Sequence, residues 1–210
     1  MQNDVLRIVA TLDTGFYLTG GTAVSRLYCH HRFSDDLDLF VNDQAQFALW
    51  GERIVAALIR QPEWQCHVIQ KDEQFFRLNV VWQDVRLKID LVNDVPAHIG
   101  QIRYHGELGR VDSAENILAN KLSAVISREE PKDLADIWGL SKLCGLSIED
   151  AITDAQSKAA GIFPVALARF LLSASLEDWS AIRWQRAPSV DRYLADLYEL
   201  GEALILGKQA

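Results

Sequence analysis

The chain has 210 residues, of which 49% are hydrophobic, so it can bury a core of ordinary size within one large domain or two modest ones. It contains no apolar run long enough to cross a bilayer, and its first residues lack the pattern of a secretory signal, so we expect a cytoplasmic protein. A formal net charge of −8 argues against wrapping long nucleic acid, which requires many Lys and Arg side chains.

The first half of the chain alternates between short helical and strand-like segments. Helices are predicted over residues 5–12, from residue 22 and over 44–60, and strands over 16–18, 37–41, 65–70, 75–82 and 85–92. Gln83 and Asp84 separate the last two strands and look like a tight hairpin turn.

Beyond residue 112 the apolar residues recur three and four apart, which is typical of helices. Helices are predicted over residues 113–127, 132–144, 147–159, 163–173 and 189–205. The whole pattern predicts an α+β protein, with an α/β domain over residues 1–111 and a helical domain over residues 112–210.

A glycine pair stands between a predicted strand and a predicted helix. Gly20 and Gly21 allow the backbone to turn sharply there, and the free N–H groups from the turn to Thr22 would suit a phosphate. Taken alone, the pair is explained better by a structural turn than by a binding loop.

Acidic residues follow this turn. Asp36 and Asp38 fall on one face of a predicted strand while Leu37 and Leu39 fall on the other, and Asp90 lies opposite the apolar face of a later strand. If the two strands are neighbours, three carboxylates meet on one surface. Such a cluster needs divalent metal, a basic neighbour or raised pKa values, and paired carboxylates are typical of two-metal phosphoryl-transfer sites. The alternative is that they are unrelated, solvated strand ends.

The helical half offers charged residues that share helix faces. Lys121 and Arg128 are seven residues apart on one predicted helix, and Pro131 marks the start of the next. Asp133 and Asp136 are one turn apart on that second helix. They could face a site together, although ordinary helix-end chemistry also explains Asp133, and the two cations could be solvated surface residues.

The remaining polar and aromatic residues are less specific. His30, His31 and Arg32 form a short basic cluster that could balance the acids, meet phosphates of an acceptor or simply end a helix. We expect packing roles for Trp138, Trp179 and Trp184. Cys29, Cys66 and Cys144 lack the spacing of a zinc site or a disulfide framework and are expected to be reduced thiols.

Several of these motifs resemble a known family. The runs GGTA at residues 20–23 and RFSDDLDLF at residues 32–40 resemble the signature of the AbiEii/AbiGii toxin family of nucleotidyltransferases, within the DNA polymerase beta-like superfamily. Residues 117–124 and 128–136 resemble the later lysine and K-D-x-x-D motifs of that family. The resemblance therefore covers the chain from about residue 16 to residue 140.

The resemblance implies a polymerase beta-like mixed sheet with flanking helices, followed by an α-helical domain. It also implies an NTP-dependent, two-metal enzyme that transfers a nucleoside monophosphate to an acceptor hydroxyl on RNA, protein or a small molecule. Such an enzyme would be the toxin of a toxin–antitoxin pair, with an antitoxin protein as partner. The site residues carried over are Asp36, Asp38 and Asp90 as catalytic ligands of Mg²⁺ or Mn²⁺, and Gly20, Gly21, Thr22, Ser34, Lys121 and Asp133 as nucleotide-binding residues.

Two other functions remain open. One is an inactive binding module that keeps the scaffold and acts through a protein partner. A metal-dependent nuclease that uses the same acids is weaker, because it would leave the glycine turn without a task.

Overall fold

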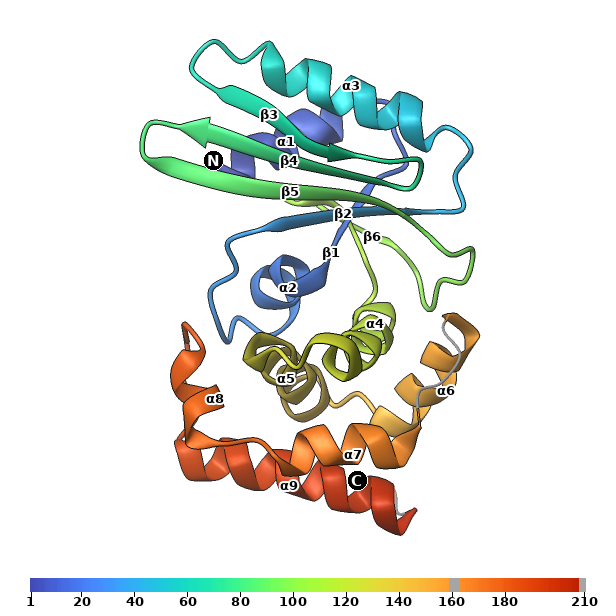
Figure 1. Cartoon of the computed structure of the whole chain (residues 1–210), viewed down its shortest axis with the longest axis vertical. Coiled ribbons are helices and arrows are strands. Elements are labelled where there is room, and N and C mark those ends of the chain that lie inside the picture. Colours follow the sequence, from blue (N-terminus) through green and yellow to red (C-terminus); the bar gives the residue numbers. More distant parts are fainter. Residues whose placement is uncertain (159–162, 208–210) are drawn as a thin grey trace. The chain divides into compact units, whose positions relative to one another are not determined.

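The computed structural model describes residues 1–158 and 163–207 (Figure 1). The chain forms two compact units, one built from Met1–Thr22 and Asp35–Asp112, the other from Ala23–Ser34 and the described part of Ser113–Ala210. Residues 23–34 therefore belong with the helical half, although the sequence pattern places them in the α/β half. No helix of the described residues is long and apolar enough to span a membrane.

The first unit is built on a seven-stranded mixed sheet with the strand order β3-β4-β5-β2-β1-β7-β6. β2 and β5 run parallel, as do β1 and β7, and the other neighbours are antiparallel. The strands are β1 (Tyr17–Thr19), β2 (Leu37–Asn42), β3 (Gln65–Lys71), β4 (Phe75–Trp82), β5 (Val85–Asp94), β6 (Arg103–His105) and β7 (Gly109–Val111). The helices that accompany them are α1 (Gln2–Thr11), α2 (Gly20–Ala23, which ends at the unit boundary) and α3 (Phe47–Ile59).

Alternation along the strands separates a core face of this sheet from a polar face. In β2 every second residue is buried, beginning at Leu37. The buried residues Leu18 and Leu39 share a cavity lining with Leu6 and Val9 of α1, so the apolar face of the sheet is the one that α1 covers. The intervening residues of β2, which include Asp38, therefore point to the opposite face.

The second unit is helical. Its elements are η1 (Val24–Tyr28), α4 (Ala114–Arg128), α5 (Pro131–Trp138), η2 (Gly139–Leu143), α6 (Ile148–Lys158), α7 (Pro164–Leu172), α8 (Leu176–Ala181) and α9 (Val190–Leu206), where η1 and η2 are π-helical. Ser113 caps α4 by accepting a hydrogen bond from the Asn116 N–H, and Pro131 occupies the first turn of α5, where its missing N–H costs nothing.

The observed elements confirm the predicted α+β class and most of the predicted segments. The two-residue hairpin turn is also present, with Gln83 at a φ of +53°. β6, β7 and α8 were not predicted, because each is short and lacks a clear apolar period. Ala159, the last residue of one predicted helix, lies outside the described residues.

Candidate functional site

Asp38 and Asp90 occupy partner positions on two adjacent strands. β2 and β5 pair in parallel with Asp38 opposite Asp90, so their Cα atoms are separated by about the 4.8 Å that divides neighbouring strands. Asp36 lies directly before β2, and its carboxylate shares the Lys88 ammonium with that of Asp90. From the sequence, this neighbouring of the two acidic strands was stated only as a condition, and the structure meets it, which brings three carboxylates together on the polar face of the first unit.

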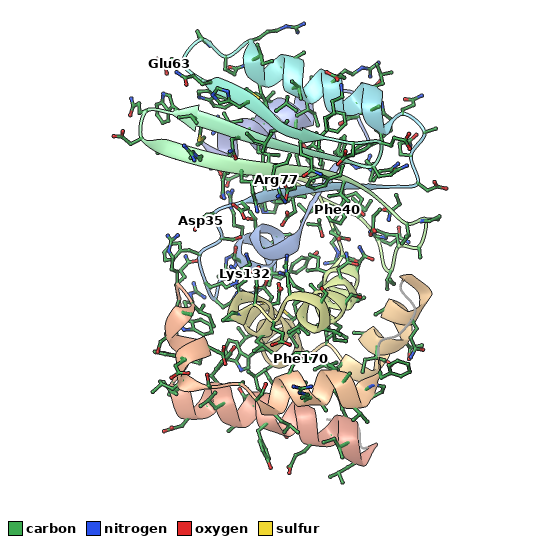
Figure 2. The ribbon with its side chains drawn as sticks, in the orientation of Figure 1. Asp35, Phe40, Glu63, Arg77, Lys132 and Phe170 are labelled. Carbon is green, nitrogen blue, oxygen red and sulfur yellow. The ribbon has the colours of Figure 1, made fainter. Side chains whose placement is uncertain are left out.

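Two basic residues on the same face form ion pairs with Asp36 and Asp90. Lys88 of β5 places its Nζ 2.7 Å from Asp36 Oδ2 and 3.9 Å from Asp90 Oδ2. Arg77 of β4 is the register partner of Asp90 and donates from Nε and Nη2 to its two oxygens, each at 2.8 Å (Figure 2 labels Arg77). A planar guanidinium fork of this kind fixes the orientation of a carboxylate as well as its charge.

The pKa values of the two cations reflect this pairing. The hydrogen bonds to Asp90 raise the pKa of Arg77. Partial burial alone would lower the pKa of Lys88, but its hydrogen bond to Asp36 and the charges of all three carboxylates outweigh burial and raise it. Both side chains are therefore charged at neutral pH, and the site carries two fixed cations against three carboxylates.

The glycine turn packs directly against the carboxylate of Asp38. Gly20 has a φ of +65°, and a Cβ atom there would collide with the Asp38 carboxylate. Glycine is therefore required at this position both for its conformation and for its lack of a side chain. Gly21 and Thr22 are buried in α2, where the Thr22 hydroxyl donates to the main-chain oxygen of Asp36. The turn and the first acidic strand are thus one connected structure.

A second set of bonds braces the strand that leads into the turn. The Thr19 hydroxyl donates to Asp112 Oδ2 at 2.6 Å, and His98 Nε2 lies 2.9 Å from Asp112 Oδ1. Asp112 is fully buried, and its main-chain N–H also bonds to Leu18 O at 2.9 Å. These contacts fix the end of β1 immediately before Gly20.

In the second unit, Lys121 bridges two buried carboxylates. Its Nζ lies 2.7 Å from Asp133 Oδ1 and 2.6 Å from Asp136 Oδ2, and only 7% of its side chain is exposed. Asp133 also receives the Arg128 guanidinium, from Nε at 2.6 Å and from Nη2 at 2.9 Å. The face of α4 that carries Lys121 and Arg128 therefore meets the face of α5 that carries Asp133 and Asp136, as inferred from the sequence. These four residues form an ion cluster.

Asp136 ties the segment before the acidic strand to α5. Arg32 donates from Nε and Nη2 to the two Asp136 oxygens at 2.7 Å each, and His31 Nε2 lies 3.1 Å from Asp136 Oδ1. His31 and Asp136 are fully buried, and Arg32 is nearly so. Two of the three residues of the basic cluster seen in the sequence, His31 and Arg32, thus bind a buried aspartate of their own unit.

Opposite charges keep this cluster ionised. Burial alone would raise the pKa of Asp136, but Lys121 and Arg32 outweigh it and hold that pKa well below its usual value. Burial alone would also raise the pKa of Asp133, but Lys121 and Arg128 outweigh burial and lower that pKa. The pKa of Lys121 is raised, since its two carboxylate partners exceed the effect of complete burial.

The sequence-predicted site residues therefore fall into two groups. Gly20, Gly21, Thr22, Asp36, Asp38 and Asp90 come together in the first unit, and Lys121 and Asp133 in the second. Ser34 is half-buried and is the last residue of the 23–34 segment, directly before the first unit resumes.

The donor set in the first unit fits a hard divalent cation. Carboxylate oxygens are the ligands that Mg²⁺ and Mn²⁺ prefer, and Asp36, Asp38 and Asp90 supply them from one surface. As the side chains stand, no three His, Cys, Asp or Glu residues among the described ones converge on a single metal position. Lys88 and Arg77 hold Asp36 and Asp90, so these two contacts would have to open for the carboxylates to converge.

The roles of Arg77 and Lys88 were missed in the sequence, although a signal existed. Lys88 stands two residues before Asp90, hence on the same face of its strand. A two-residue turn at Gln83 and Asp84 pairs residue 82 with 85, and continuing that register pairs 77 with 90. His98, by contrast, lies outside the described strands and helices, and no sequence pattern connects it to Asp112.

Comparison with known families gives one match across nearly the whole chain. Residues 4–199 match the family described as the nucleotidyl transferase AbiEii toxin of type IV toxin–antitoxin systems. Among curated proteins, no sequence matches.

Solved structures share the fold at low sequence identity. JHP933 from Helicobacter pylori is 18% identical with a TM-score of 0.62, covering 98% of this chain and 91% of its own. A second H. pylori structure is 17% identical with a TM-score of 0.64, covering 98% and 94%. MenT4, a nucleotidyltransferase toxin from Mycobacterium tuberculosis, is 16% identical with a TM-score of 0.60, covering 97% and 81%.

Proposed function

Because the chain belongs to the AbiEii family of nucleotidyltransferase toxins of type IV toxin–antitoxin systems, we propose that it transfers a nucleoside monophosphate from an NTP to an acceptor hydroxyl. The acceptor is an RNA, a protein or a small molecule, and pyrophosphate is released. A partner antitoxin would counter the activity. The observation that carries the proposal is the pairing of Asp38 with Asp90, beside a glycine turn that packs on the Asp38 carboxylate.

In this proposal, Asp36, Asp38 and Asp90 hold Mg²⁺ or Mn²⁺. Such an ion would lower the pKa of an attacking hydroxyl and offset the charge that develops during transfer. The turn from Gly20 to Thr22, together with Ser34, lines the triphosphate. Phosphoryl transfer depends mainly on positioning and on electrostatic stabilisation, so a rigid turn beside the carboxylates suits the reaction.

Arg77 and Lys88 offset two of the three negative charges of the carboxylates in the site. Three carboxylates on adjacent strands would repel one another, at about 4 kcal/mol for two charges 4 Å apart at an effective dielectric of 20. The ammonium of Lys88 lies against Asp36 and near Asp90, two of the residues that would hold a divalent cation. If such a cation took over these carboxylates, Lys88 would be free to contact a phosphate.

Lys121 and Asp133 enter the proposal as positioning residues. The Lys121 ammonium is bound by two buried carboxylates, and only 7% of its side chain is exposed, so it has little access to a phosphate. Through Asp136, the same cluster holds Arg32, two residues before Ser34. It therefore fixes the segment that leads into the acidic strand.

The test is nucleotidyl transfer by the full-length chain. The purified protein is incubated with Mg²⁺ or Mn²⁺, each of the four α-labelled NTPs and a cell extract, and the labelled product is then identified. We expect one NTP to label an acceptor, and the double variant Asp36→Asn, Asp38→Asn to abolish labelling. Asp35→Asn is the matched control, because Asp35 is exposed and precedes the pair directly.

Three outcomes would contradict the proposal. Labelling by the double variant at the wild-type level would remove the metal-binding carboxylates from the mechanism. Calorimetry that shows no metal-dependent NTP affinity would favour the inactive binding module instead, while release of cleaved nucleic-acid ends without pyrophosphate would indicate a nuclease.

A further inference from the structure

Two cysteine thiols, distant in sequence, lie side by side in the second unit. Cys29 Sγ and Cys144 Sγ are 3.4 Å apart. Each cysteine directly follows a π-helical segment, and its N–H bonds five residues back, from Cys29 to Val24 O at 2.8 Å and from Cys144 to Gly139 O at 3.2 Å. The two π-helical segments contact each other, so the backbone of both sides sets the position of the thiols.

The surroundings leave room for the pair. A Cβ atom on Gly139 would lie 3.2 Å from Cys29 Sγ, a tight contact that glycine avoids. Cys144 directly follows η2 and precedes Gly145, which has a φ of +72°, a conformation in which glycine is unstrained. A disulfide requires an S–S distance of about 2.05 Å, so the sulfur atoms need to approach by only about 1.4 Å.

The two thiols differ in access to solvent. Cys29 is 7% exposed, whereas Cys144 is on the surface. The hydrogen bond between the two thiols lowers the pKa of Cys144, while the same bond and burial raise the pKa of Cys29. The exposed sulfur is therefore the better nucleophile, and the buried one is placed to react with it afterwards.

We propose that Cys144 and Cys29 form a peroxide-reactive modification site, separate from the carboxylate site. The Cys144 thiolate attacks the O–O bond of a hydroperoxide, forms an S–O bond and releases water or an alcohol, which leaves a sulfenic acid. The Cys29 sulfur then attacks the Cys144 sulfur, the S–S bond forms, and the sulfenic oxygen leaves as water with the Cys29 proton. The two thiols lose two hydrogen atoms in total, and the peroxide is reduced.

A disulfide between Cys29 and Cys144 would connect two chain segments that are already held together by the bonds of Asp136 to His31 and Arg32. Cys29 lies two residues before His31, whose ring bonds to Asp136 on α5, and Cys144 directly follows the continuation of α5 in η2. A disulfide would add a covalent bond between the same two chain segments. Oxidation should therefore hold the 23–34 segment in place even when the ionic contacts are weakened.

The experiment maps the thiols of the full chain after peroxide treatment. Protein is treated with increasing hydrogen peroxide, free thiols are alkylated, and non-reduced peptides are analysed by mass spectrometry. We expect a Cys29–Cys144 linked peptide with the loss of two hydrogen atoms, reversed by dithiothreitol. The oxidised chain should unfold at a higher urea concentration than the reduced one.

Cys66 is the internal control, since it lies on β3 of the other unit and burial raises the pKa of its thiol. Its thiol should stay reduced, and therefore be alkylated, at every peroxide concentration. In Cys29→Ser the Cys144 sulfenic acid should persist and react with dimedone, whereas in Cys144→Ser the Cys29 thiol should resist oxidation. Equal peroxide sensitivity of all three cysteines, or Cys29 and Cys144 both remaining thiols, would overturn the inference. Neither result depends on nucleotidyl transfer.

Discussion

Asp38 and Asp90 face each other across neighbouring parallel strands, and each is held by a different part of the first unit. Gly20 packs against the Asp38 carboxylate, while the Arg77 guanidinium grips both oxygens of Asp90. The geometry of the acidic pair therefore depends on residues that carry no negative charge themselves, and those residues can be tested separately from the carboxylates.

Removing the Lys88 ammonium should strengthen metal binding. Lys88 pairs with Asp36, and a part-exposed ion pair contributes about 0.2–1 kcal/mol, so Lys88→Met should tighten Mn²⁺ binding by roughly 1.4- to fivefold. Calorimetry or the EPR signal of free Mn²⁺ measures this directly. Arg86→Met is the control, because Arg86 is exposed on the same strand face but further from the acids. Unchanged or weaker Mn²⁺ binding in Lys88→Met would exclude competition between the lysine and the metal.

Substituting Gly20 should lower the stability of the protein and displace the Asp38 carboxylate. Gly20→Ala places a side chain at positive φ, which costs about 1–3 kcal/mol, and its Cβ would push the Asp38 carboxylate away. We expect a lower urea midpoint together with weaker Mn²⁺ binding. Gly106→Ala should change neither, since a Cβ there meets nothing within 4 Å. If Gly20→Ala bound Mn²⁺ normally, the turn would not be positioning Asp38.

Neutralising Asp136 should be among the most destabilising single changes in the chain. Asp136→Asn leaves the buried Lys121 and Arg32 with too little negative charge, and breaking a buried ion pair costs about 3–5 kcal/mol. Chemical denaturation measures the loss, with Asp84→Asn in the exposed hairpin turn as the control. A loss of less than 1 kcal/mol would mean that the cluster contributes little to folding.

Stability should fall in acid because of the same cluster. The folded-state pKa values of Asp133 and Asp136 lie below the unfolded value of 3.8, so the unfolded chain takes up protons first as the pH drops. Their contribution is complete above that unfolded pKa and is lost as the pH falls through the folded values. Urea denaturation between neutral and strongly acidic pH should show this decline, and Asp136→Asn should flatten it. Parallel pH profiles for the two proteins would assign the acid sensitivity to other carboxylates.

Much of the first-unit site could be predicted because strand geometry is simple. Alternation along residues 36–40 and 85–91 separates acids from apolar residues, and a two-residue turn fixes the hairpin register. The same rules extend to Arg77 and Lys88. What they cannot give is the order of the strands, so the parallel pairing of β2 with β5 could be stated only as a condition.

The helical half was less predictable at the level of contacts. Periodicity placed Lys121 with Arg128, and Asp133 with Asp136, on common faces, but it does not say which faces meet or how deeply they are buried. The partnership of Arg32 with Asp136 joins residues 104 positions apart, which no local pattern encodes. The buried setting of Lys121 emerges only from that long-range packing.

The bonds between Arg32 and Asp136 also affect when the chain can fold during its synthesis and where it can be split into fragments. Residues 23–34 leave the ribosome long before α4 and α5, so Arg32 and His31 have no counter-charge from this cluster until residue 136 has been made. A fragment that stops at residue 111 would carry these basic side chains without the Asp136 carboxylate. The complementary fragment would lack residues 23–34, whose His31 and Arg32 bind Asp136 of α5. A division of the chain into two expressible halves therefore has to move residues 23–34 along with the C-terminal half.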